Sequence, residues 1–236
     1  KPQFVDRTVR MVLRDRNHPS VAFWSLGNES GGGANFNATY NATRELDPRP
    51  IHYEGATRAG TSPSDIRSYM YYGVDQVERG VKGSTPYFLC EYAHAMGNAV
   101  GNLQEYWDVI EGSNSGMGGC IWDWVEQSVY GAQDIKDGTL TTNGIPRYKT
   151  GNDFGGPHQG NFVNNGLVSA DRAWSAELTE VKRVYQNVRF GNMAGKKCTV
   201  RNAFIFTNLD KFGLRYTVVE DGVPGETGTM DLPTTN

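Results

Sequence analysis

The pattern of apolar and polar positions divides the chain into two stretches of different rhythm. In about the first 130 residues, short apolar runs bounded by glycine or proline alternate with segments of helical spacing. This spacing predicts helices over residues 4–17, 34–46 and 103–110. The apolar runs predict five strands, the first beginning at Val21 and the others over residues 50–55, 68–72, 86–92 and 119–125. A repeated order of strand, loop and helix is typical of a parallel α/β sheet.

The rhythm changes after about Val129. Residues 131–165 are rich in Gly, Asn, Asp and Thr and have no periodicity, so we predict a long ordered loop there. From Glu180 onward the apolar spacing is two residues, and one such run ends at Asp221-Gly222, a typical turn pair. This stretch therefore predicts antiparallel hairpins, the opening strands of a sandwich domain.

Composition narrows the possible functions. The 236 residues carry 23 basic and 26 acidic side chains, a formal charge of −3, which argues against a basic nucleic-acid surface or a polybasic membrane anchor. No apolar run approaches the ~18–20 residues that cross a bilayer. The 29 glycines and the many aromatic residues suggest tight loops around an aromatic-lined site. The cysteines are interpreted as buried reduced thiols: Cys90, Cys120 and Cys198.

Acidic residues follow several of the predicted strands. Glu29 and Glu91 each stand at a strand end, and Glu54 is a third acid in a similar place. The carboxyl ends of parallel strands are where ligands bind. A lone strand-end glutamate is more often a salt-bridge partner or a solvated loop residue. Here, however, amide, imidazole and indole side chains adjoin the acids, and that combination suits a sugar, whose rings stack on aromatics and whose hydroxyls need polar partners.

Three long motifs make the interpretation specific. They are RDRNHPSVAFWSLGNESGGG, LCEYAHAMGN and GGCIWDWVEQS, and DFGGPHQGNFVNNGLVSADR follows them. Together they closely resemble the β-galactosidases of glycoside hydrolase family two, the lac type, along the whole chain. The resemblance implies an α/β fold: residues 1–178 would form a partial (β/α)8 TIM barrel, about strands 4–8, with a long loop after the last strand. Residues 179–236 would begin an antiparallel β-sandwich.

The resemblance also implies roles for individual residues. In a retaining, exo-acting β-galactosidase, Glu29 of GNES would be the general acid/base and Glu91 of CEYAH the nucleophile. The substrate contacts would be Asn28 at the sugar 2-hydroxyl, His94 at another hydroxyl, Tyr71 beside the nucleophile and Trp122 as the stacking platform. Glu29 would also be a ligand of Mg²⁺, while the Phe162 carbonyl and Asn165 would hold Na⁺. Asp123 and Glu126 stand near the last strand end, and the sequence leaves open whether they support the site.

Physical requirements agree with this assignment. A retaining glycosidase needs two carboxyl groups about 5–5.5 Å apart, one ionised to attack and one protonated to donate. We therefore expect Glu29 and Glu91, on the first and fourth strands, to share one pocket. Two alternatives remain: another family two retaining enzyme, such as a β-glucuronidase or β-mannosidase, or a non-catalytic carbohydrate-binding protein, although binding alone needs no acid pair.

The length suggests that more protein belongs to this fold. An eight-stranded barrel takes ~250 residues, and five parallel strands would leave unpaired edges. We expect a longer enzyme, by resemblance a homo-oligomer acting on a β-galactoside, and we expect these residues alone to be insoluble or inactive. The sequence does not decide between a cytoplasmic and a periplasmic location in a bacterium.

Overall fold

The chain forms two compact units, residues 1–181 and 182–236. The computed structural model describes residues 1–60, 63–131, 133, 141–142, 145–195 and 197–232. In that described part, no helix has the length and apolar composition needed to cross a membrane. The division falls near the expected boundary at residues 178 and 179, within a helix that the sequence did not predict.

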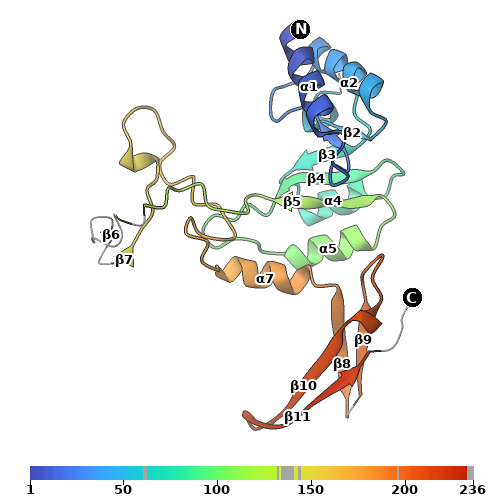
Figure 1. Cartoon of the computed structure of the whole chain (residues 1–236), viewed down its shortest axis with the longest axis vertical. Helices are drawn as coiled ribbons and strands as arrows, with labels where there is room; N and C mark the ends of the chain where they lie inside the picture. Colours follow the sequence, from blue (N-terminus) through green and yellow to red (C-terminus); the bar gives the residue numbers. More distant parts are fainter. Residues whose placement is uncertain (61–62, 132, 134–140, 143–144, 196, 233–236) are drawn as a thin grey trace. The chain divides into compact units, whose positions relative to one another are not determined.

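Five parallel strands organise the first unit (Figure 1). β1 (Trp24–Ser25) pairs with β2 (Ile51–His52), and β3 (Arg67–Met70), β4 (Tyr87–Tyr92) and β5 (Gly116–Ile121) form a second sheet in chain order. A parallel bridge between His52 and Ile66 links the two sheets. Each strand therefore lies beside the next one along the chain, and the predicted parallel α/β pattern is confirmed.

The connections between these strands are helical. α1 (Pro2–Asp15) precedes β1, α2 (Ala34–Leu46) and α5 (Leu103–Glu111) match two predicted helices, and α3 (Glu54–Ala59) and α4 (Val74–Gly80) were not predicted. The last two have six and seven residues, too few to give a helical period in the sequence. The rings of Phe4 and Phe36 meet edge to face between α1 and α2, at a centroid distance of 6.0 Å.

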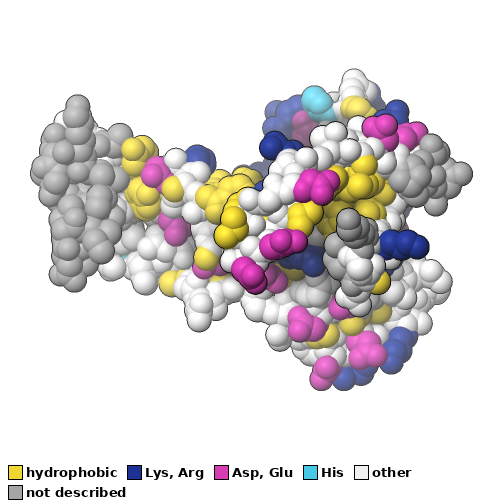
Figure 2. Space-filling view, turned by 90° about the horizontal axis from the view of Figure 1, so that it is seen from below, with side chains coloured by type: hydrophobic (Ala, Val, Ile, Leu, Met, Phe, Trp, Pro, Cys, Tyr) yellow, Lys and Arg dark blue, Asp and Glu magenta, His cyan; other side chains and the backbone are white. Residues whose placement is uncertain are grey.

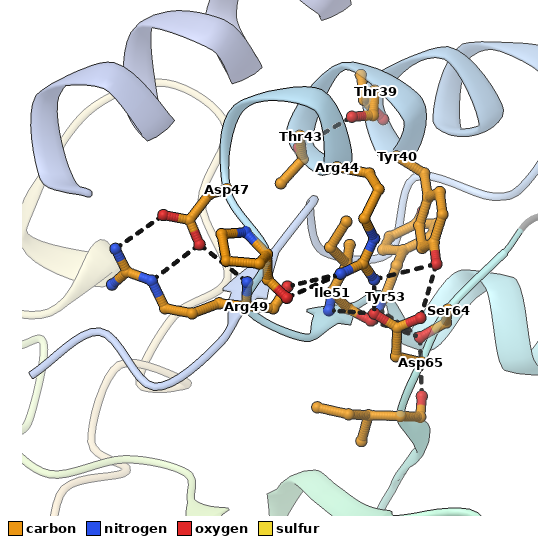
Figure 3. Close-up of polar contacts among 12 residues, drawn as sticks. Thr39, Tyr40, Thr43, Arg44, Asp47, Arg49, Ile51, Tyr53, Ser64 and Asp65 are labelled. Atoms are coloured by element: carbon orange, nitrogen blue, oxygen red, sulfur yellow. Dashed lines mark hydrogen bonds and ion pairs between the residues drawn. The ribbon is translucent and has the colours of Figure 1, made fainter. Parts of the chain in front are cut away.

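A polar network ties α2 to the start of β2 (Figure 3). The carboxylate of Asp65 forms an ion pair with Arg44 and accepts hydrogen bonds from the hydroxyl of Tyr40 (2.6 Å) and the backbone N–H of Ile51 (2.7 Å). Nearby, Arg49 pairs with the buried carboxylate of Asp47, with Nε and Oδ1 at 2.9 Å. Helix, strand and following loop are thus joined by charged hydrogen bonds, which are stronger than neutral ones.

Several predicted strand bounds were wrong: the strand predicted from Val21 begins at Trp24, and the strand predicted over residues 68–72 ends at Met70. The strand predicted over residues 50–55 ends at His52, because α3 begins at Glu54. The strand predicted over residues 119–125 is β5, which ends at Ile121. Beyond it the chain leaves the sheet and bonds to a distant segment: the N–H of Asp123 donates to the carbonyl of Asn165 at 2.7 Å, and a parallel bridge joins Val125 to Val168.

The predicted loop over residues 131–165 contains short regular pieces. They are β6 (Thr141–Thr142), β7 (Ile145–Pro146) and the 3₁₀ turn η1 (Gly151–Asp153). Residues 132, 134–140 and 143–144 of this prediction lie outside the described residues. The turn is held by the guanidinium of Arg147, which makes two hydrogen bonds to Asp153, at 2.6 and 2.7 Å.

Two hairpins make up most of the second unit. α7 (Ala176–Val184) replaces the first residues of the predicted two-residue rhythm. It is followed by the antiparallel pairs β8 (Val188–Ala194) with β9 (Lys197–Asn202) and β10 (Gly213–Glu220) with β11 (Val223–Asp231). The predicted turn at Asp221-Gly222 is confirmed, and both residues have the positive φ values, 52° and 80°, that tight hairpin turns require. That these hairpins open a β-sandwich stays a prediction.

Candidate active site

Several candidate side chains come from the carboxyl ends of four of the five parallel strands. Asn28 and Glu29 follow β1, Tyr71 follows β3, Glu91 lies near the end of β4, and Trp122 follows β5. Because adjacent parallel strands end at the same edge, residues separated by up to 94 positions are brought to one rim. Left-handed backbone recurs there, with φ values of 46° at Glu29 and 53° at Tyr71.

A cavity of about 410 Å³ opens among these strand ends. Asn28, Glu91 and Trp122 all line it, together with the third acid of the sequence prediction, Glu54. The volume lies within the ~300–1,000 Å³ of ordinary small-molecule sites. A larger hollow of about 620 Å³ lies among residues of the segment 126–169, and of the residues named from the sequence only Glu126, whose role was left open, lines it, whereas Asp123 lines the smaller cavity. We therefore take the smaller cavity as the candidate site.

Glu91 is held by a direct hydrogen bond. The hydroxyl of Tyr71 donates to Oε2 of Glu91 at 2.8 Å, and the backbone N–H of Tyr71 donates to the carbonyl of the same residue at 2.9 Å. Burial, followed by the hydrogen bond and charge of Glu91 and by the charge of Glu29, raises the pKa of Tyr71. The phenol therefore stays protonated and remains a donor. Glu29 is exposed and is not among the described residues that line the cavity, so its expected place in one pocket with Glu91 stays a prediction.

Ring contacts extend from Tyr71 around the rim. Its ring centroid lies 6.0 Å from that of His94, and His94 lies 5.3 Å from Phe162. The Nε2 atom of His94 is buried and has no hydrogen-bond partner among the described residues. A buried ring nitrogen without a hydrogen bond costs free energy. We therefore expect a ligand hydroxyl or a water molecule to bind it.

Trp122 and Asn165 meet on another side of the site. With its amide turned so that both groups are satisfied, Asn165 accepts a hydrogen bond from the indole Nε1 of Trp122 and donates one to the carbonyl of Val163, each at 3.2 Å. Asn165 is only 2 % exposed. Its amide therefore positions the indole, while a second lone pair of its oxygen remains for another partner.

Two polar residues that line the cavity were not singled out from the sequence. His52 and Ser25 both line it, and the hydroxyl of Ser25 lies 3.0 Å from Nδ1 of His52. Burial lowers the pKa of His52 to about 4, so its ring is neutral near pH 7. His52 is the last residue of β2, so its place at a strand end was the available signal, although the strand predicted over residues 50–55 ran beyond it.

Two cysteines also line the cavity, Cys90 from β4 and Cys120 from β5. Cys90 is half-buried, whereas Cys120 and Cys198 are exposed, so the prediction of buried thiols was wrong for the latter two. Burial raises the pKa of Cys90 to about 11 and also raises that of Cys120. Both groups are therefore neutral thiols near pH 7 and poor nucleophiles.

Residues 1–190 match the family model described as glycosyl hydrolases family 2, TIM barrel domain. The chain belongs to glycoside hydrolase family 2. The resemblance inferred from the three motifs is thus confirmed, and a TIM-barrel-type fold accounts for the parallel strands joined by helices in chain order.

Relatives within family 2 differ in how much they share with this chain. A β-galactosidase of Priestia megaterium (strain DSM 319 / IMG 1521) is 42 % identical over 229 residues, which are 94 % of this chain and 21 % of that protein. The chain therefore spans about a fifth of the length of this curated relative. Among solved structures, the β-glucuronidase of Ruminococcus gnavus in complex with uronic isofagomine has a TM-score of 0.53 at 18 % identity, covering 78 % of this chain and 35 % of that one. At that identity the likeness supports the fold alone.

The donor atoms that the resemblance assigns to Mg²⁺ and Na⁺ can be compared with the structure. The amide oxygen of Asn165 and the carbonyl of Phe162 are the hard oxygen donors that such cations prefer. Glu29 offers an exposed carboxylate. Nowhere in the described residues do three or more His, Cys, Asp or Glu side chains gather as a metal-binding group. The chemistry of the donors fits, and these residues would supply one ligand to Mg²⁺ and two to Na⁺.

Proposed function

We propose that this chain carries both catalytic carboxylates of a retaining, exo-acting β-galactosidase. Glu91 is the nucleophile and Glu29 the general acid/base. The observation that carries the proposal is the hydrogen bond from Tyr71 to Glu91 at the mouth of a cavity that Asn28, the neighbour of Glu29, also lines. A carboxylate fixed by a protonated phenol is oriented for attack on a carbon that lies in the cavity.

The reaction proceeds by double displacement. A carboxylate oxygen of Glu91 attacks the anomeric carbon while Glu29 gives its proton to the departing glycosidic oxygen, so that one ester bond forms as the glycosidic bond breaks. Glu29, now a carboxylate, then takes a proton from a water molecule. That water attacks the anomeric carbon, releases galactose with retained configuration and returns Glu91 to its starting state.

Three side chains bind the sugar. The amide of Asn28 hydrogen-bonds the 2-hydroxyl, and the buried, unpaired Nε2 of His94 receives a partner from another hydroxyl. The indole of Trp122, held by Asn165, provides the flat surface on which the apolar face of the ring stacks. In each contact a polar side chain gains a sugar hydroxyl as its hydrogen-bond partner, or an aromatic ring gains the apolar face of the sugar.

The charge of the cavity supports a neutral sugar. Its described lining includes the carboxyl groups of Glu54, Glu91 and Asp123 and no lysine or arginine. A uronic acid would place another carboxylate among these groups, and like charges at short range repel. This is why we favour a galactoside over the uronide substrate class named for the Ruminococcus gnavus structural neighbour. A β-mannosidase-like hydrolase and a non-catalytic carbohydrate-binding protein would also accept a neutral sugar, and covalent labelling distinguishes them from a β-galactosidase.

The chain is proposed to be part of a longer enzyme, with its five strands about the fourth to eighth of the barrel. Large hydrophobic side chains that remain on the surface support this (Figure 2). They include Trp124 at 58 %, Trp174 at 60 %, Ile205 at 86 % and Phe206 at 97 %. Surfaces of this kind usually pack against further protein. When bound, Mg²⁺ beside Glu29 and Na⁺ at Phe162 and Asn165 would supply positive charge next to the sugar site.

A covalent trapping experiment tests the proposal. The full-length polypeptide that contains these residues is incubated with a 2-deoxy-2-fluoro-β-galactoside carrying a good leaving group, and the labelled peptide is mapped. Label on Glu91 is expected, together with near-complete loss of turnover but retained sugar binding in Glu91→Gln. A folded protein that binds galactose yet takes no label would support a non-catalytic binding protein. Faster labelling by the matching 2-fluoro-glucuronide or 2-fluoro-mannoside would overturn the choice of sugar.

A further inference from the structure

The loop that carries Glu29 has an unusual backbone. Residues 27–33, here called the acid/base loop, connect β1 to α2 and include positive φ values at Glu29 (46°), Gly31 (71°) and Gly33 (114°). Left-handed backbone is unfavourable for a residue with a side chain such as glutamate, so it persists only where surrounding contacts hold it. The position of the Glu29 carboxylate therefore depends on what holds this loop.

Tyr53 makes the contact that reaches the acid/base loop from the neighbouring strand. It follows β2, and its hydroxyl donates a hydrogen bond to the carbonyl of Gly31 at 2.5 Å. The side chain is fully buried, and burial raises its pKa, so the phenol keeps its proton and remains a donor. Gly31 lies two residues beyond Glu29, so the hydrogen bond holds the same loop close to the proposed acid/base in the sequence.

Tyr53 is itself fixed from two other directions. Its ring stacks on Phe36 of α2 with centroids 3.9 Å apart and an angle of 14° between the planes. Its backbone N–H donates to the hydroxyl of Ser64 at 3.1 Å (Figure 3). The phenol therefore cannot shift without disturbing α2 and β2 together, which makes it a rigid support.

There is no spare room around the hydrogen bond. A Cβ atom added at Gly55 in α3 would lie 2.6 Å from the Tyr53 hydroxyl oxygen and 2.7 Å from the carbonyl oxygen of Gly31. These separations are too short for real atoms, so the backbone of α3 closes directly over the contact. Both partners of the hydrogen bond are confined by packing as well as by the bond itself.

We infer that Tyr53 is a positioning residue for the proton-transfer step of the proposed reaction, acting through Gly31 on the acid/base Glu29. Tyr53 is not among the described residues that line the cavity, so its role is to position another residue. Without its hydroxyl, the carbonyl of Gly31 loses its donor and the left-handed turn at Glu29 can relax. The inference rests on the proposed function, because it assigns a role relative to Glu29.

Leaving-group dependence tests this role. Proton donation matters most when the departing oxygen is a poor leaving group and little when it is a good one. In Tyr53→Phe, which keeps the ring stack, we expect kcat/KM to fall about tenfold for methyl β-galactoside and less than about twofold for 2,4-dinitrophenyl β-galactoside. Rates are expressed per active site titrated with the 2-fluoro reagent, so that partial unfolding changes the number of sites and leaves the ratio unaffected.

Tyr40→Phe is the matched control. This hydroxyl donates to Asp65 at 2.6 Å and accepts from Arg44 at 3.2 Å, so the variant loses at least as much hydrogen bonding as Tyr53→Phe, but Tyr40 has no described hydrogen bond to the acid/base loop. We expect both substrates to be unaffected by it. A second measurement uses azide, an anion that needs no general base: azide should raise kcat of Tyr53→Phe with the dinitrophenyl substrate and leave wild type and Tyr40→Phe unchanged.

The outcomes separate this inference from the proposed function. Equal losses for the two substrates in Tyr53→Phe, or no loss for either, would overturn the positioning role while wild-type activity and labelling stand. Wild-type protein that neither hydrolyses galactosides nor takes the fluorosugar label would instead refute the proposed function. A selective loss for the poor leaving group, with azide rescue, supports the inference.

Discussion

Tyr71 is hydrogen-bonded to Glu91 twice, once through its phenol (2.8 Å to Oε2) and once through its backbone N–H (2.9 Å to the carbonyl). The backbone bond belongs to the pairing of β3 with β4, and the phenol bond lies just beyond it at the strand ends. The pairing of two strands thus places a donor on the proposed nucleophile. The resemblance implied that Tyr71 lies beside the nucleophile, and the structure adds the two hydrogen bonds that join it to Glu91.

Removal of the phenol hydroxyl should slow catalysis. In Tyr71→Phe we expect kcat to fall about 10–100-fold, because the Glu91 carboxylate loses the donor that orients it. The raised pKa of Tyr71 means that the proton is retained as pH increases, so the ratio of wild-type to variant rates should be constant from about pH 6 to 10. A pH–rate profile measures this ratio, and convergence of the two rates at about pH 9 would contradict it.

Tyr106→Phe is a control for this variant. Its hydroxyl donates to the carbonyl of Tyr72 at 2.8 Å and has no described hydrogen bond to Glu91. Its kcat should stay within about twofold of wild type, because a neutral hydrogen bond away from the reacting atoms affects mainly stability.

Mild acid should destabilise the fold through His52. Burial lowers the pKa of this ring from 6.5 to about 4. Between these two values the unfolded chain binds a proton at His52 and the native state does not. Stability is therefore present in full above the unfolded pKa and is lost as pH falls toward 4. Between about pH 8 and pH 5 the loss should be about 2 kcal/mol.

Urea unfolding at the two pH values measures the His52 contribution. His52→Gln should remove most of the acid sensitivity in this window, whereas His18→Gln, at an exposed position, should preserve it. The carboxyl of Asp47, whose pKa Arg49 lowers to about 2 chiefly through side-chain hydrogen bonding, adds its own loss only at lower pH. An unchanged pH dependence in His52→Gln would show that another group is responsible.

Asp65 should make a large contribution to the free energy of unfolding. Asp65→Asn weakens the ion pair with Arg44 and the hydrogen bonds from Tyr40 and Ile51, so we expect a loss of about 2 kcal/mol in the free energy of unfolding. Asp6→Asn is the comparison, because Asp6 pairs with Arg10 one helical turn away on an exposed face. It should cost less than about 0.5 kcal/mol. If urea titrations give the same loss in the free energy of unfolding for both variants, Asp65 has no special role in stability.

Gly166 should tolerate no side chain. A Cβ there would lie 1.9 Å from the backbone N of Glu126 and 2.7 Å from the carbonyl oxygen of Val168, where residues 123–126 pair with residues 165–168. Gly166→Ala should therefore cost about 3 kcal/mol or more and reduce the soluble yield. Gly155→Ala, with nothing within 4 Å of its Cβ, should behave as wild type in thermal unfolding.

Local signals in the sequence were enough for several elements. The helix predicted over residues 34–46 is α2 with the same bounds, because Asp47-Pro48 cannot continue a helix. The turn at Asp221-Gly222 follows likewise from two residues that accept positive φ. Short helices such as α4 were not predictable, because seven residues contain too few apolar positions to show a period.

The end of β5 shows where local signals fail. Trp122 and Trp124 continue the alternation of a strand, yet the chain turns away after Ile121 to bond with Asn165 and Val168. Those partners lie more than 40 residues further on, and their position is a property of packing. Alternation of apolar and polar residues indicates that a segment is extended, but it does not indicate which other segment pairs with it.

The sequence by itself determined the family and the chemical groups, because motif residues such as Glu29 and Glu91 stand next to strand-end signals that can be read locally. The resemblance already implied that Tyr71 lies beside Glu91, but tertiary structure alone decided that Tyr53 meets Gly31 and that Ser25 meets His52. Each of these contacts crosses between strands or loops distant in the chain. Strand order and the packing of buried rings decide which residues form such pairs. Both depend on the whole fold, so no short stretch of sequence predicts them.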